Sequence, residues 1–358
     1  MLESCSLERG GSRVGVATAV NVLIVGGGSI GERHLRCFQQ VGSGDVALCE
    51  ADPARRAELI NRYGLKSAPA DVDEAAGRDW DAVVICTPAH RHVEQAIRLA
   101  PTTPALLIEK PLSTRLDEID SLRSATEGKC VQVAYVLRAH PAVQQAIGKL
   151  EEGAVGELLQ VTVVAGQHFP TFRPAYREIY YTNHATGGGA VQDAVTHLVN
   201  LVQCFAGRFD CVFCDYAHQA LEGVEVEDTV HLVGRAGGRR VMVSIALNQF
   251  MAPNETWVQL NGIRGSLGLR LDEHRWGLLC RGDDAWRWSE PLVAERDDLF
   301  RFQARAFLDA AAGRGPNLCP LDEAVHTLRV NLAALASRGA APIAIEETAA
   351  EATGGAPR

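Results

Sequence analysis

The sequence lacks both a long apolar run and a dense cluster of basic residues. No stretch is typical of the roughly 20-residue apolar segment that spans a bilayer, so no membrane partner is expected. The 35 Lys and Arg are outnumbered by 44 Asp and Glu, which gives a formal net charge of -9. Because nucleic-acid-binding surfaces are basic, this balance argues against a nucleic-acid partner and favours small-molecule ligands.

The cysteines lack the regular spacing of a disulfide framework or a metal site. Cys49, Cys86 and Cys204 fall inside apolar stretches, which is typical of buried thiols in a reducing compartment, so a cytoplasmic location is expected. Cys211 and Cys214 form one CxxC, but its context, FDCVFCDY, predicts a strand that sends the two sulfurs to opposite faces. No metal site is therefore expected.

Both ends of the chain, residues 1–19 and 342–358, are predicted to be mobile tails. The first leads into VGVATAVNVLIVGGG, which has the small-residue pattern of a secretory signal after Arg13. That stretch continues directly into a glycine-rich turn, as a core strand does, so we reject export.

The 358 residues are enough for two domains, and the pattern changes near residue 140. In residues 20–140, five short apolar runs alternate with segments of helical period, which predicts an α/β domain with a parallel sheet covered on both faces. In residues 141–341, strand-like runs follow one another between Gly, Asn and Asp turns. Two helical segments, RDDLFRFQARAFLDAAAG and LDEAVHTLRVNLAALAS, close that region. It is predicted to be an α+β domain with a large, mostly antiparallel sheet.

A glycine-rich turn follows the first apolar run and opens a helix. Gly26, Gly28 and Gly31 stand in G-x-G-x-x-G spacing, with Ser29 and Ile30 between them. In a dinucleotide-binding unit the first glycine permits the tight turn, the second lets the backbone approach the pyrophosphate, and the third allows close helix packing. The alternative is a glycine-rich turn in a domain that binds no dinucleotide.

An acidic residue stands where such a unit binds the adenosine ribose. Glu50 follows the next apolar run, about 20 residues after the glycines, and its carboxylate would repel the extra phosphate of NADP. NAD is therefore the expected cofactor. Arg55 and Arg56 follow in the next helix and could soften that preference, so NADP remains an alternative.

Two later apolar runs end in polar motifs. DAVVICTP ends at Thr87 and Pro88, with a helix starting near His92, and ALLIEKP ends at Glu109 and Lys110. Both motifs lie at the carboxyl edge of the predicted sheet, where ligands bind in open α/β folds. The alternative for Lys110 is an ordinary ion pair at a strand end.

An aspartate and a histidine four positions apart follow three consecutive glycines in TGGGAVQDAVTHLVN. On one helix Asp193 and His197 would project side by side. By themselves they are either a catalytic pair or a helix cap with a buried histidine.

Together these motifs resemble the Gfo/Idh/MocA oxidoreductase family, which includes glucose-fructose oxidoreductase and inositol dehydrogenases. The resemblance covers nearly the whole chain between the tails and implies a Rossmann dinucleotide-binding domain followed by a substrate domain. It also implies hydride transfer between a nicotinamide and a secondary alcohol or ketone of a sugar, cyclitol or sugar derivative. The cofactor contacts expected from the glycine turn and the resemblance are Gly26, Gly28, Ser29, Ile30, Gly31, Glu50, Thr87, Pro88, His92, Glu109 and Lys110.

The resemblance places Lys110, Asp193 and His197 around the substrate carbon. His197 is the candidate base for the hydroxyl proton, because histidine titrates near neutral pH. Asp193 would hold the imidazole in one tautomer, and the ammonium of Lys110 would hydrogen-bond the substrate oxygen as it gains charge. The glycines before them would let the backbone approach the substrate closely.

One stretch departs from the family pattern. Where members often read GYNxRFxP, this chain reads AYVLRAHP, with Val136 at the asparagine position and Ala139 at the phenylalanine position. The missing amide removes one usual hydrogen bond to cofactor or substrate. Arg138 and Pro141 keep their places, and Arg138 could serve only to anchor the domain junction.

The stretch HFPTFRPAYREIYYTNHATGGG is rich in aromatic residues, arginine and histidine and is expected to line the substrate pocket. Its arginines favour a substituent with negative charge, and both a free sugar or cyclitol and a nucleotide-linked sugar are candidates. The residues singled out as substrate contacts are Tyr176, Arg177, Tyr181, Asn183 and His184.

Two other functions are compatible with these motifs. Some members of the family keep NAD bound and cleave a glycosidic bond by transient oxidation, in which case NADH would not accumulate. A non-catalytic sensor would bind a dinucleotide and a regulatory partner, but it would not need to keep Lys110, Asp193 and His197 together.

The second region has few helices to cover its sheet. Apolar side chains such as those in RVMVSIAL therefore need another cover on the open face, and a second subunit could supply it. A homodimer or homotetramer is expected.

Overall fold

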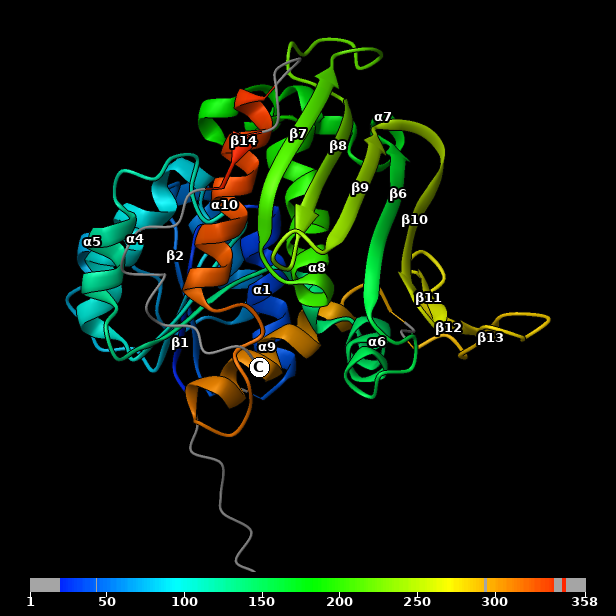
Figure 1. Cartoon of the computed structure of the whole chain (residues 1–358). Coiled ribbons are helices and arrows are strands. Elements are labelled where there is room, and N and C mark those ends of the chain that lie inside the picture. Colours follow the sequence, from blue (N-terminus) through cyan, green and yellow to red (C-terminus); the bar gives the residue numbers. More distant parts are fainter. Residues whose placement is uncertain (1–19, 43, 293–294, 338–342, 346–358) are drawn as a thin grey trace, which may run out of the picture.

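The computed structural model describes residues 20–42, 44–292, 295–337 and 343–345 (Figure 1). The tail predicted at residues 1–19 lies outside the described residues, and so do residues 346–358. The C-terminal tail was predicted to begin at residue 342. Ile343 and Ala344 instead form a short strand, β14, that pairs with Val212 and Cys211.

The N-terminal sheet has five strands in the order β2-β1-β3-β4-β5, and all its pairs are parallel. Each strand lies in one of the five apolar runs, so the predicted parallel sheet is confirmed. Apolar residues fill these strands because helices cover both faces of such a sheet. The strands are β1 (Val22–Val25), β2 (Val46–Cys49), β3 (Ala82–Ile85), β4 (Ala105–Ile108) and β5 (Cys130–Val133).

Helices alternate with these strands, as the sequence pattern predicts. The helix α2 shows how local sequence sets their bounds: the Asp52 carboxylate caps its first turn, and Gly64 ends it in a left-handed conformation. The helices of this region are α1 (Ser29–Gln40), α2 (Pro53–Tyr63), α3 (Val72–Ala75), α4 (His92–Leu99) and α5 (Ile119–Ala125).

The second sheet has nine strands in the order β13-β12-β11-β10-β6-β9-β8-β7-β14. Only the pair β6 and β9 is parallel among its described pairs, so the mostly antiparallel sheet is confirmed. The sequence pattern missed β12, β13 and β14. The bounds are β6 (Leu158–His168), β7 (Phe209–Ala217), β8 (Thr229–Ala236), β9 (Val241–Asn248), β10 (Phe250–Gly262), β11 (Gly265–Arg270), β12 (Arg275–Cys280), β13 (Arg287–Trp288) and β14 (Ile343–Ala344).

Helices α8 and α10 lie between the two sheets (Figure 1). The two predicted closing helices are present as α9 (Asp298–Ala311) and α10 (Leu321–Ala336), while α6 (Pro141–Glu151) and α8 (Thr196–Ala206) pack on the second sheet. Phe307 of α9 belongs to the apolar core on one face of the first sheet, and α10 contributes Val325 to the core on its other face and Val330 to the core of the second sheet. The sequence pattern therefore changes near residue 140, but helices from after that residue also pack on the first sheet.

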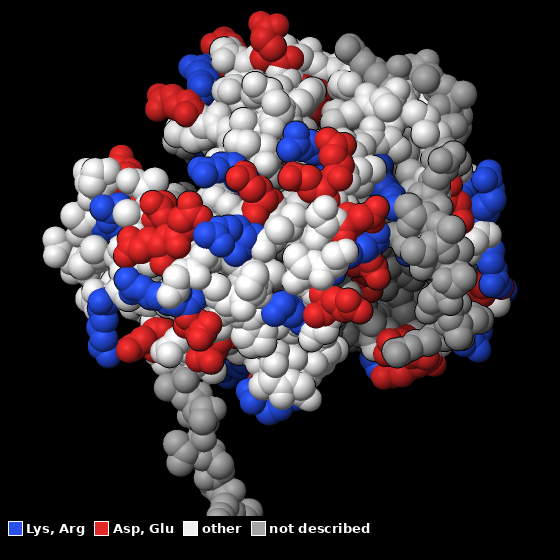
Figure 2. Space-filling model, turned by 90° about the vertical axis from the view of Figure 1, so that its left-hand side faces the viewer, with Lys and Arg blue, Asp and Glu red and all other residues white. Residues whose placement is uncertain are grey.

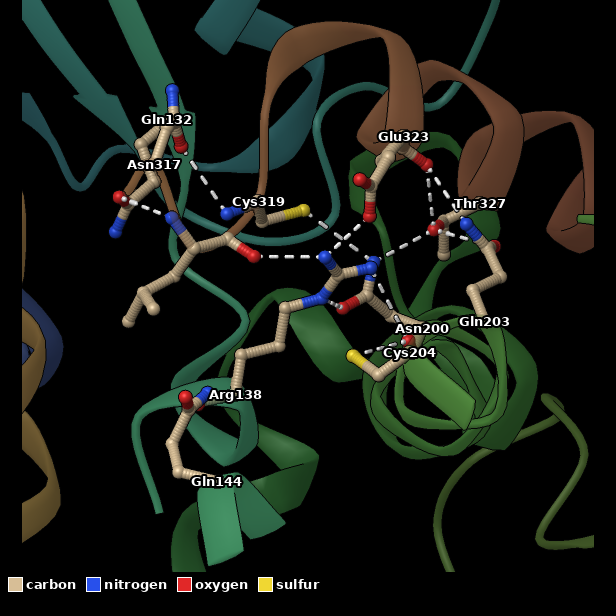
Figure 3. A network of polar contacts seen from close by, with 11 residues as sticks. Gln132, Arg138, Gln144, Asn200, Gln203, Cys204, Asn317, Cys319, Glu323 and Thr327 are labelled. Carbon is tan, nitrogen blue, oxygen red and sulfur yellow. Dashed lines mark hydrogen bonds and ion pairs between the residues drawn. The ribbon is translucent and has the colours of Figure 1, made fainter. Parts of the chain in front are cut away.

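A buried polar network joins the two regions at Arg138 (Figure 3). Its guanidinium donates from Nε to Asn200 Oδ1 at 2.6 Å and from NH1 to Leu318 O at 2.8 Å, and it pairs with Glu323. Burial of Arg138 disfavours its charge, but Glu323 and neighbouring groups offset that cost and raise its pKa. The structure thus gives Arg138 the anchoring task that its sequence position allowed.

The same network fixes the helix α8. Asn200 donates from Nδ2 to Thr327 Oγ1 at 2.9 Å, and Thr327 donates to Gln203 Oε1 at 2.9 Å. Asn200 stands three residues after His197, so the network holds the helix that carries this candidate base against α10 and the junction (Figure 3).

Another histidine, His140, caps α6 and stacks on His274. Its Nδ1 accepts from the Ala142 amide at 3.0 Å, and its Nε2 lies 3.2 Å from Nδ1 of His274. Burial, followed by the neighbouring His274, lowers the pKa of His140 from 6.5 to about 4. The unfolded chain therefore binds more protons than the folded one between these values, and stability falls as pH decreases through that window.

We expect the melting temperature to fall between pH 6.5 and about pH 4, and less steeply in a His140→Asn variant. Asparagine offers an oxygen to cap α6 but takes up no proton. Thermal unfolding of both proteins across that pH range checks this prediction. Equal slopes would show that His140 is not a source of the acid sensitivity.

Charged side chains of both signs are interspersed over the face shown in Figure 2. Many charged side chains of the protein are paired, among them Arg78 with Glu74 and Arg98 with Asp73. Within the described residues, no helix is long and apolar enough to cross a membrane, and no cluster of three or more His, Cys, Asp or Glu could hold a metal ion. Cys211 and Cys214 lie on β7 as free thiols.

Candidate active site

The glycine turn between β1 and α1 disfavours side chains at Gly26 by its backbone conformation and at Gly31 by lack of space. Gly26 has a φ of 96°, and a Cβ on Gly31 would lie 1.8 Å from the carbonyl oxygen of Gly26. Gly28 differs, because nothing lies within 4 Å of the position of its Cβ. As the N-cap of α1 it also supplies no side-chain acceptor, so the first N–H groups of the helix remain available to a phosphate. Ser29 and Ile30 form the first turn of α1.

A cleft of about 680 Å³ extends from this turn along the carboxyl edge of the first sheet. Its size suits an adenosine and a pyrophosphate. Gly26, Gly28, Glu50, Thr87 and Pro88 all line it. The open backbone at Gly28, the uncapped helix and the size of the cleft together fit a dinucleotide.

Glu50 is held at the wall of this cleft by the backbone. Its Oε2 accepts from the Gly27 amide at 2.6 Å, and its Oε1 accepts from the Asp52 amide at 2.8 Å. Arg55 donates from Nε to the Gly27 carbonyl at 2.9 Å, and Arg56 donates to the Glu50 carbonyl at 2.6 Å. Both arginines are thus engaged by the protein itself.

His92 connects the two polar strand ends. Its Nε2 lies 2.6 Å from the Thr87 carbonyl, and its Nδ1 lies 3.0 Å from the Pro111 carbonyl. Burial lowers the pKa of His92, so the ring is neutral and donates to one of these two carbonyls at a time. His92 therefore positions the two loops, and its contact with the cofactor stays a prediction.

Glu109 lies behind Lys110 and is buried. Its Oε1 is 2.7 Å from His34 Nε2, and its Oε2 accepts from the Lys110 amide at 3.0 Å. Burial alone would raise the pKa of Glu109, but the His34 hydrogen bond and the charge of Lys110 outweigh it and lower the pKa. Glu109 is therefore a buried anion that orients the Lys110 backbone.

Lys110 and Asp193 form an ion pair across the two domains. The Lys110 ammonium donates to Asp193 Oδ1 at 2.9 Å and to the Asp193 carbonyl at 2.7 Å. Tyr180 donates to the same Oδ1 at 2.6 Å, and Arg173 NH1 lies 3.6 Å from Oδ2. Burial opposes the charge of Asp193, but these neighbours, Lys110 foremost, lower its pKa. Burial also opposes the charge of Lys110, but the Asp193 carboxylate outweighs it and raises the pKa of Lys110. The ammonium has three N–H groups, and one remains for a substrate oxygen.

His197 lies near this pair but is oriented differently from the expectation. Asp193 falls in a π-helical turn (Val191–Val195), and His197 in the first turn of α8, so the two side chains do not stack as on a regular α-helix. Nδ1 of His197 is buried and has no hydrogen-bond partner, so the prediction that Asp193 holds its tautomer is wrong. The carboxylate of Asp193 binds Lys110 and Tyr180 instead.

The environment makes His197 a neutral group. Burial, followed by the charge of Lys110, lowers its pKa from 6.5 to about 3. Tyr135 packs edge-on against its ring with centroids 6.0 Å apart, and Tyr135 also contacts Thr196 Oγ1 at 3.0 Å. His197 is therefore ready to accept a proton across the whole neutral range, although its affinity for that proton is low.

The three glycines before Asp193 make room for the protein itself. A Cβ on Gly188 would lie 2.2 Å from the Tyr181 carbonyl, and one on Gly189 would lie 2.6 Å from the Glu227 carboxylate. Gly187 faces Ala89 in the same way, at 2.9 Å. These glycines thus allow close approach between loops of the chain, and the predicted close approach of their backbone to the substrate stays a prediction.

The structure binds the side chains of the predicted substrate contacts to other parts of the chain. The hydroxyls of Tyr176 and Tyr181 are bound to the carbonyls of Glu222 and Glu227, and both side chains are buried. Arg177 also donates to the Glu222 carbonyl. Their substrate roles stay predictions.

The last two candidates hold the glycine loop in place. The Asn183 side chain accepts from the Ala185 amide at 2.9 Å, and His184 Nε2 lies 2.5 Å from the buried Glu227 carboxylate. The hydrogen bond to Glu227 raises the pKa of His184. Their substrate roles also stay predictions.

Two residues that the sequence did not single out touch the ion pair directly, Arg173 and Tyr180. Both come from the aromatic and arginine-rich stretch that was expected to line the site. That stretch folds into several short 3₁₀ turns, whose side-chain directions have no period that can be read from a sequence.

Two family models match this chain. The model described as "Oxidoreductase family, NAD-binding Rossmann fold" matches residues 20–136, and the model of the "GFO/IDH/MocA C-terminal domain" matches residues 143–268.

Curated relatives are about a quarter identical to this chain over the residues that align. Levoglucosan dehydrogenase of Pseudarthrobacter phenanthrenivorans is 27% identical over 208 residues, which are 54% of this chain and 53% of that protein. Inositol 2-dehydrogenase of Rhizobium meliloti is 27% identical over 190 residues, which are 52% of this chain and 54% of that protein. The match thus spans about half the length of each of these relatives.

The fold extends further than the sequence match. The solved structure of levoglucosan dehydrogenase in complex with NADH and levoglucosan superposes with a TM-score of 0.83 and 20% identity, covering 92% of this chain and 100% of the other. The two matched domains, in this order, show that the chain belongs to the Gfo/Idh/MocA oxidoreductase family and has an NAD-binding Rossmann domain.

Proposed function

We propose that this enzyme transfers a hydride between a nicotinamide cofactor and a secondary alcohol or ketone of a sugar, cyclitol or sugar derivative. The observation that carries the proposal is the ion pair of Lys110 with Asp193, which lies beside His197 and at the same sheet edge as the dinucleotide cleft. Relatives named levoglucosan dehydrogenase and inositol dehydrogenase support a sugar-like substrate. A cytoplasmic location stays a prediction.

Each residue of this cluster has a separate task in the proposed reaction. When bound, NAD accepts or gives the hydride. The remaining N–H of Lys110 hydrogen-bonds the substrate oxygen and stabilises negative charge that develops there. Asp193 and Tyr180 hold the ammonium in position through Asp193 Oδ1. His197 takes or returns the hydroxyl proton.

A screen of sugars, cyclitols, sugar acids and nucleotide-linked sugars for reduction of NAD tests the proposal. Steady accumulation of NADH with one of these classes supports it. Cleavage of a glycosidic bond without NADH accumulation would refute it in favour of a glycosidase that uses transient oxidation.

The cofactor preference provides a separate prediction. Glu50 presents a carboxylate to the cleft, held there by a backbone amide, and its negative charge would repel the 2′-phosphate of NADPH. Arg55 already forms ion pairs with Glu32 and Glu58, so it offers that phosphate no free positive charge. NADH should bind more tightly than NADPH by roughly tenfold or more, because a like charge in contact costs several kcal/mol. Fluorescence titration of both reduced cofactors checks this.

Matched variants locate the cause of that preference. Glu50→Gln should raise the affinity for NADPH, while Asp45→Asn, at an exposed acid that pairs with Lys66, should leave both affinities unchanged. Equal binding of the two cofactors by the unmodified protein would refute the role given to Glu50.

The open face of the second sheet supports the proposal of a homodimer or homotetramer. Val164, Val233 and Met242 are 38%, 47% and 52% exposed. Val164 lies opposite Ala246 of β9, and Val233 lies opposite Ser244 of the same strand. Met242, Ser244 and Ala246 are alternate residues of β9 and point to one face, so Val164, Val233 and Met242 share that face. Trp257 lies opposite Val164 and extends this apolar face.

Light scattering at micromolar concentration is expected to show a dimer or a tetramer. Val233→Arg should shift that assembly toward the monomer, because a second subunit would bury the new charge. Leu116→Glu, at an exposed site of the first domain, is the control. A monomeric unmodified protein would disprove assembly through this face.

A further inference from the structure

Arg173 brings a second cation to the Lys110–Asp193 pair. It follows β6 and the short helix α7 (Phe169–Phe172), and its NH1 lies 3.6 Å from Asp193 Oδ2. The guanidinium also lies 5.5 Å from the centre of the Phe169 ring. Its side chain is 42% exposed, whereas that of Lys110 is 11% exposed and that of Asp193 is 2% exposed. Arg173 is therefore the outermost charged group of the cluster.

The charge of Asp193 is already balanced without Arg173. Lys110 donates to Asp193 Oδ1 and to its carbonyl oxygen, and Tyr180 donates to the same Oδ1. Glu109, the other acid nearby, is buried behind Lys110, with its oxygens bound to His34 and to the Lys110 amide. His197 is neutral because its pKa is lowered to about 3. The exposed end of the cluster thus carries the positive charge of Arg173.

The geometry of Arg173 leaves donors for a ligand. The contact of 3.6 Å with Asp193 is longer than an ordinary hydrogen bond, and Arg173 also hydrogen-bonds Tyr180. A guanidinium has five N–H donors in a planar fork, so these contacts leave donors that fit a carboxylate. Arg177, the other arginine of the stretch, differs in this respect. It donates to the Glu222 carbonyl and the Tyr176 hydroxyl and pairs with the Glu222 carboxylate.

We propose that Arg173 binds a carboxylate of the substrate, so that the preferred substrates are acidic sugar derivatives such as aldonic or uronic acids. This inference rests on the proposed function of the Lys110–Asp193–His197 cluster. In this arrangement Lys110 binds the oxygen of the reacting carbon, and Arg173 binds the acid group of the same molecule. Neutral sugars and cyclitols lack the group that Arg173 recognises.

Pairs of substrates that differ only in the acid group test the proposal, for example glucuronate with glucose and galacturonate with galactose. The acid of a pair is expected to have the higher kcat/KM. Arg173→Met should lower kcat/KM for the acid by roughly 10- to 100-fold, mainly through KM, and should lower that for the neutral partner clearly less. Arg314→Met, at an exposed arginine between α9 and α10 that pairs with Asp309, is the control for loss of one positive charge.

A binding measurement keeps this inference separate from the proposed function. Isothermal titration of the acids into the protein with NADH should give heat with the unmodified enzyme and with Arg314→Met, but much weaker binding with Arg173→Met. Arg173→Lys, which keeps the charge without the fork, should bind the acids with intermediate affinity.

The outcomes distinguish the two claims. Oxidation of neutral sugars with no preference for acids, or an equal loss for both members of a pair in Arg173→Met, overturns the role of Arg173 and leaves the proposed function standing. Binding of acids that depends on Arg173, without NADH formation from any compound, supports the acid site and contradicts the proposed function.

Discussion

Replacing Lys110 by Met is expected to reduce kcat/KM by roughly 10²- to 10³-fold, the loss typical of one hydrogen-bond donor to a developing negative charge. The ammonium also neutralises Asp193, which is only 2% exposed. Lys110→Met therefore leaves a buried carboxylate with less compensation, and the protein should also unfold more easily. Steady-state kinetics and thermal unfolding of the variant measure both effects.

A double variant separates chemistry from stability. Lys110→Met with Asp193→Asn removes both charges, so it should recover most of the lost melting temperature and none of the lost turnover. If the double variant recovers turnover as well, Lys110 serves only as the partner of Asp193 and has no direct task at the substrate.

Replacing His197 by Ala is expected to lower turnover by roughly 10²- to 10⁴-fold, the usual contribution of a general base, with NAD binding nearly unchanged. Binding and chemistry should separate because Gly26, Gly28 and Glu50 line the cleft of the other domain. Turnover with a working substrate and fluorescence titration of NADH measure the two effects. Circular dichroism should show an intact fold, and near-normal turnover would return His197 to the role of a buried histidine.

The pH dependence of alcohol oxidation follows from the same environment. Because the pKa of His197 is lowered from 6.5 to about 3, its protonation should not limit the rate near neutral pH. An ordinary histidine would instead make the rate rise between pH 6 and 7. Any rise in that range must come from another group, and His197→Ala should retain it.

The first sheet could be predicted from the sequence because each of its strands is a continuous apolar run, and buried parallel strands require such runs. The glycine turn could be predicted for a similar reason. Gly31 has no alternative where its Cβ would lie 1.8 Å from a carbonyl oxygen. In both cases a local steric or burial requirement fixes the residue type directly.

The relation of Asp193 to His197 could not be predicted, because it depends on a π-turn. A spacing of four residues places two side chains together only if the helix is regular. Here the turn containing Asp193 is wider than an α-helical turn, and its carboxylate is directed to Lys110 and Tyr180. The turn forms where Glu227 accepts from the Val191 amide, a contact between distant segments.

The glycines before Asp193 were predicted to let the backbone approach the substrate, and the structure shows that other atoms of the protein lie against them. The sequence shows that residues 187–189 have no side chains. It does not show which atoms occupy the space that those side chains would fill. The atoms prove to be the Tyr181 carbonyl and the Glu227 carboxylate. Likewise Arg173 and Tyr180 were in the expected stretch, but only the tertiary fold brings them, rather than Tyr176 and Tyr181, to the ion pair.

The central claim is that the cluster at Lys110, Asp193 and His197 transfers a hydride from a substrate carbon to the nicotinamide. A substrate deuterated at the reacting carbinol carbon tests it most directly. Incubation with NAD should yield NADH that carries one deuterium by mass spectrometry, with a slower rate than the unlabelled substrate, and Lys110→Met should form little of it. Product formation that leaves the deuterium on the substrate carbon, or labelled NADH formed equally well by Lys110→Met, would contradict this claim.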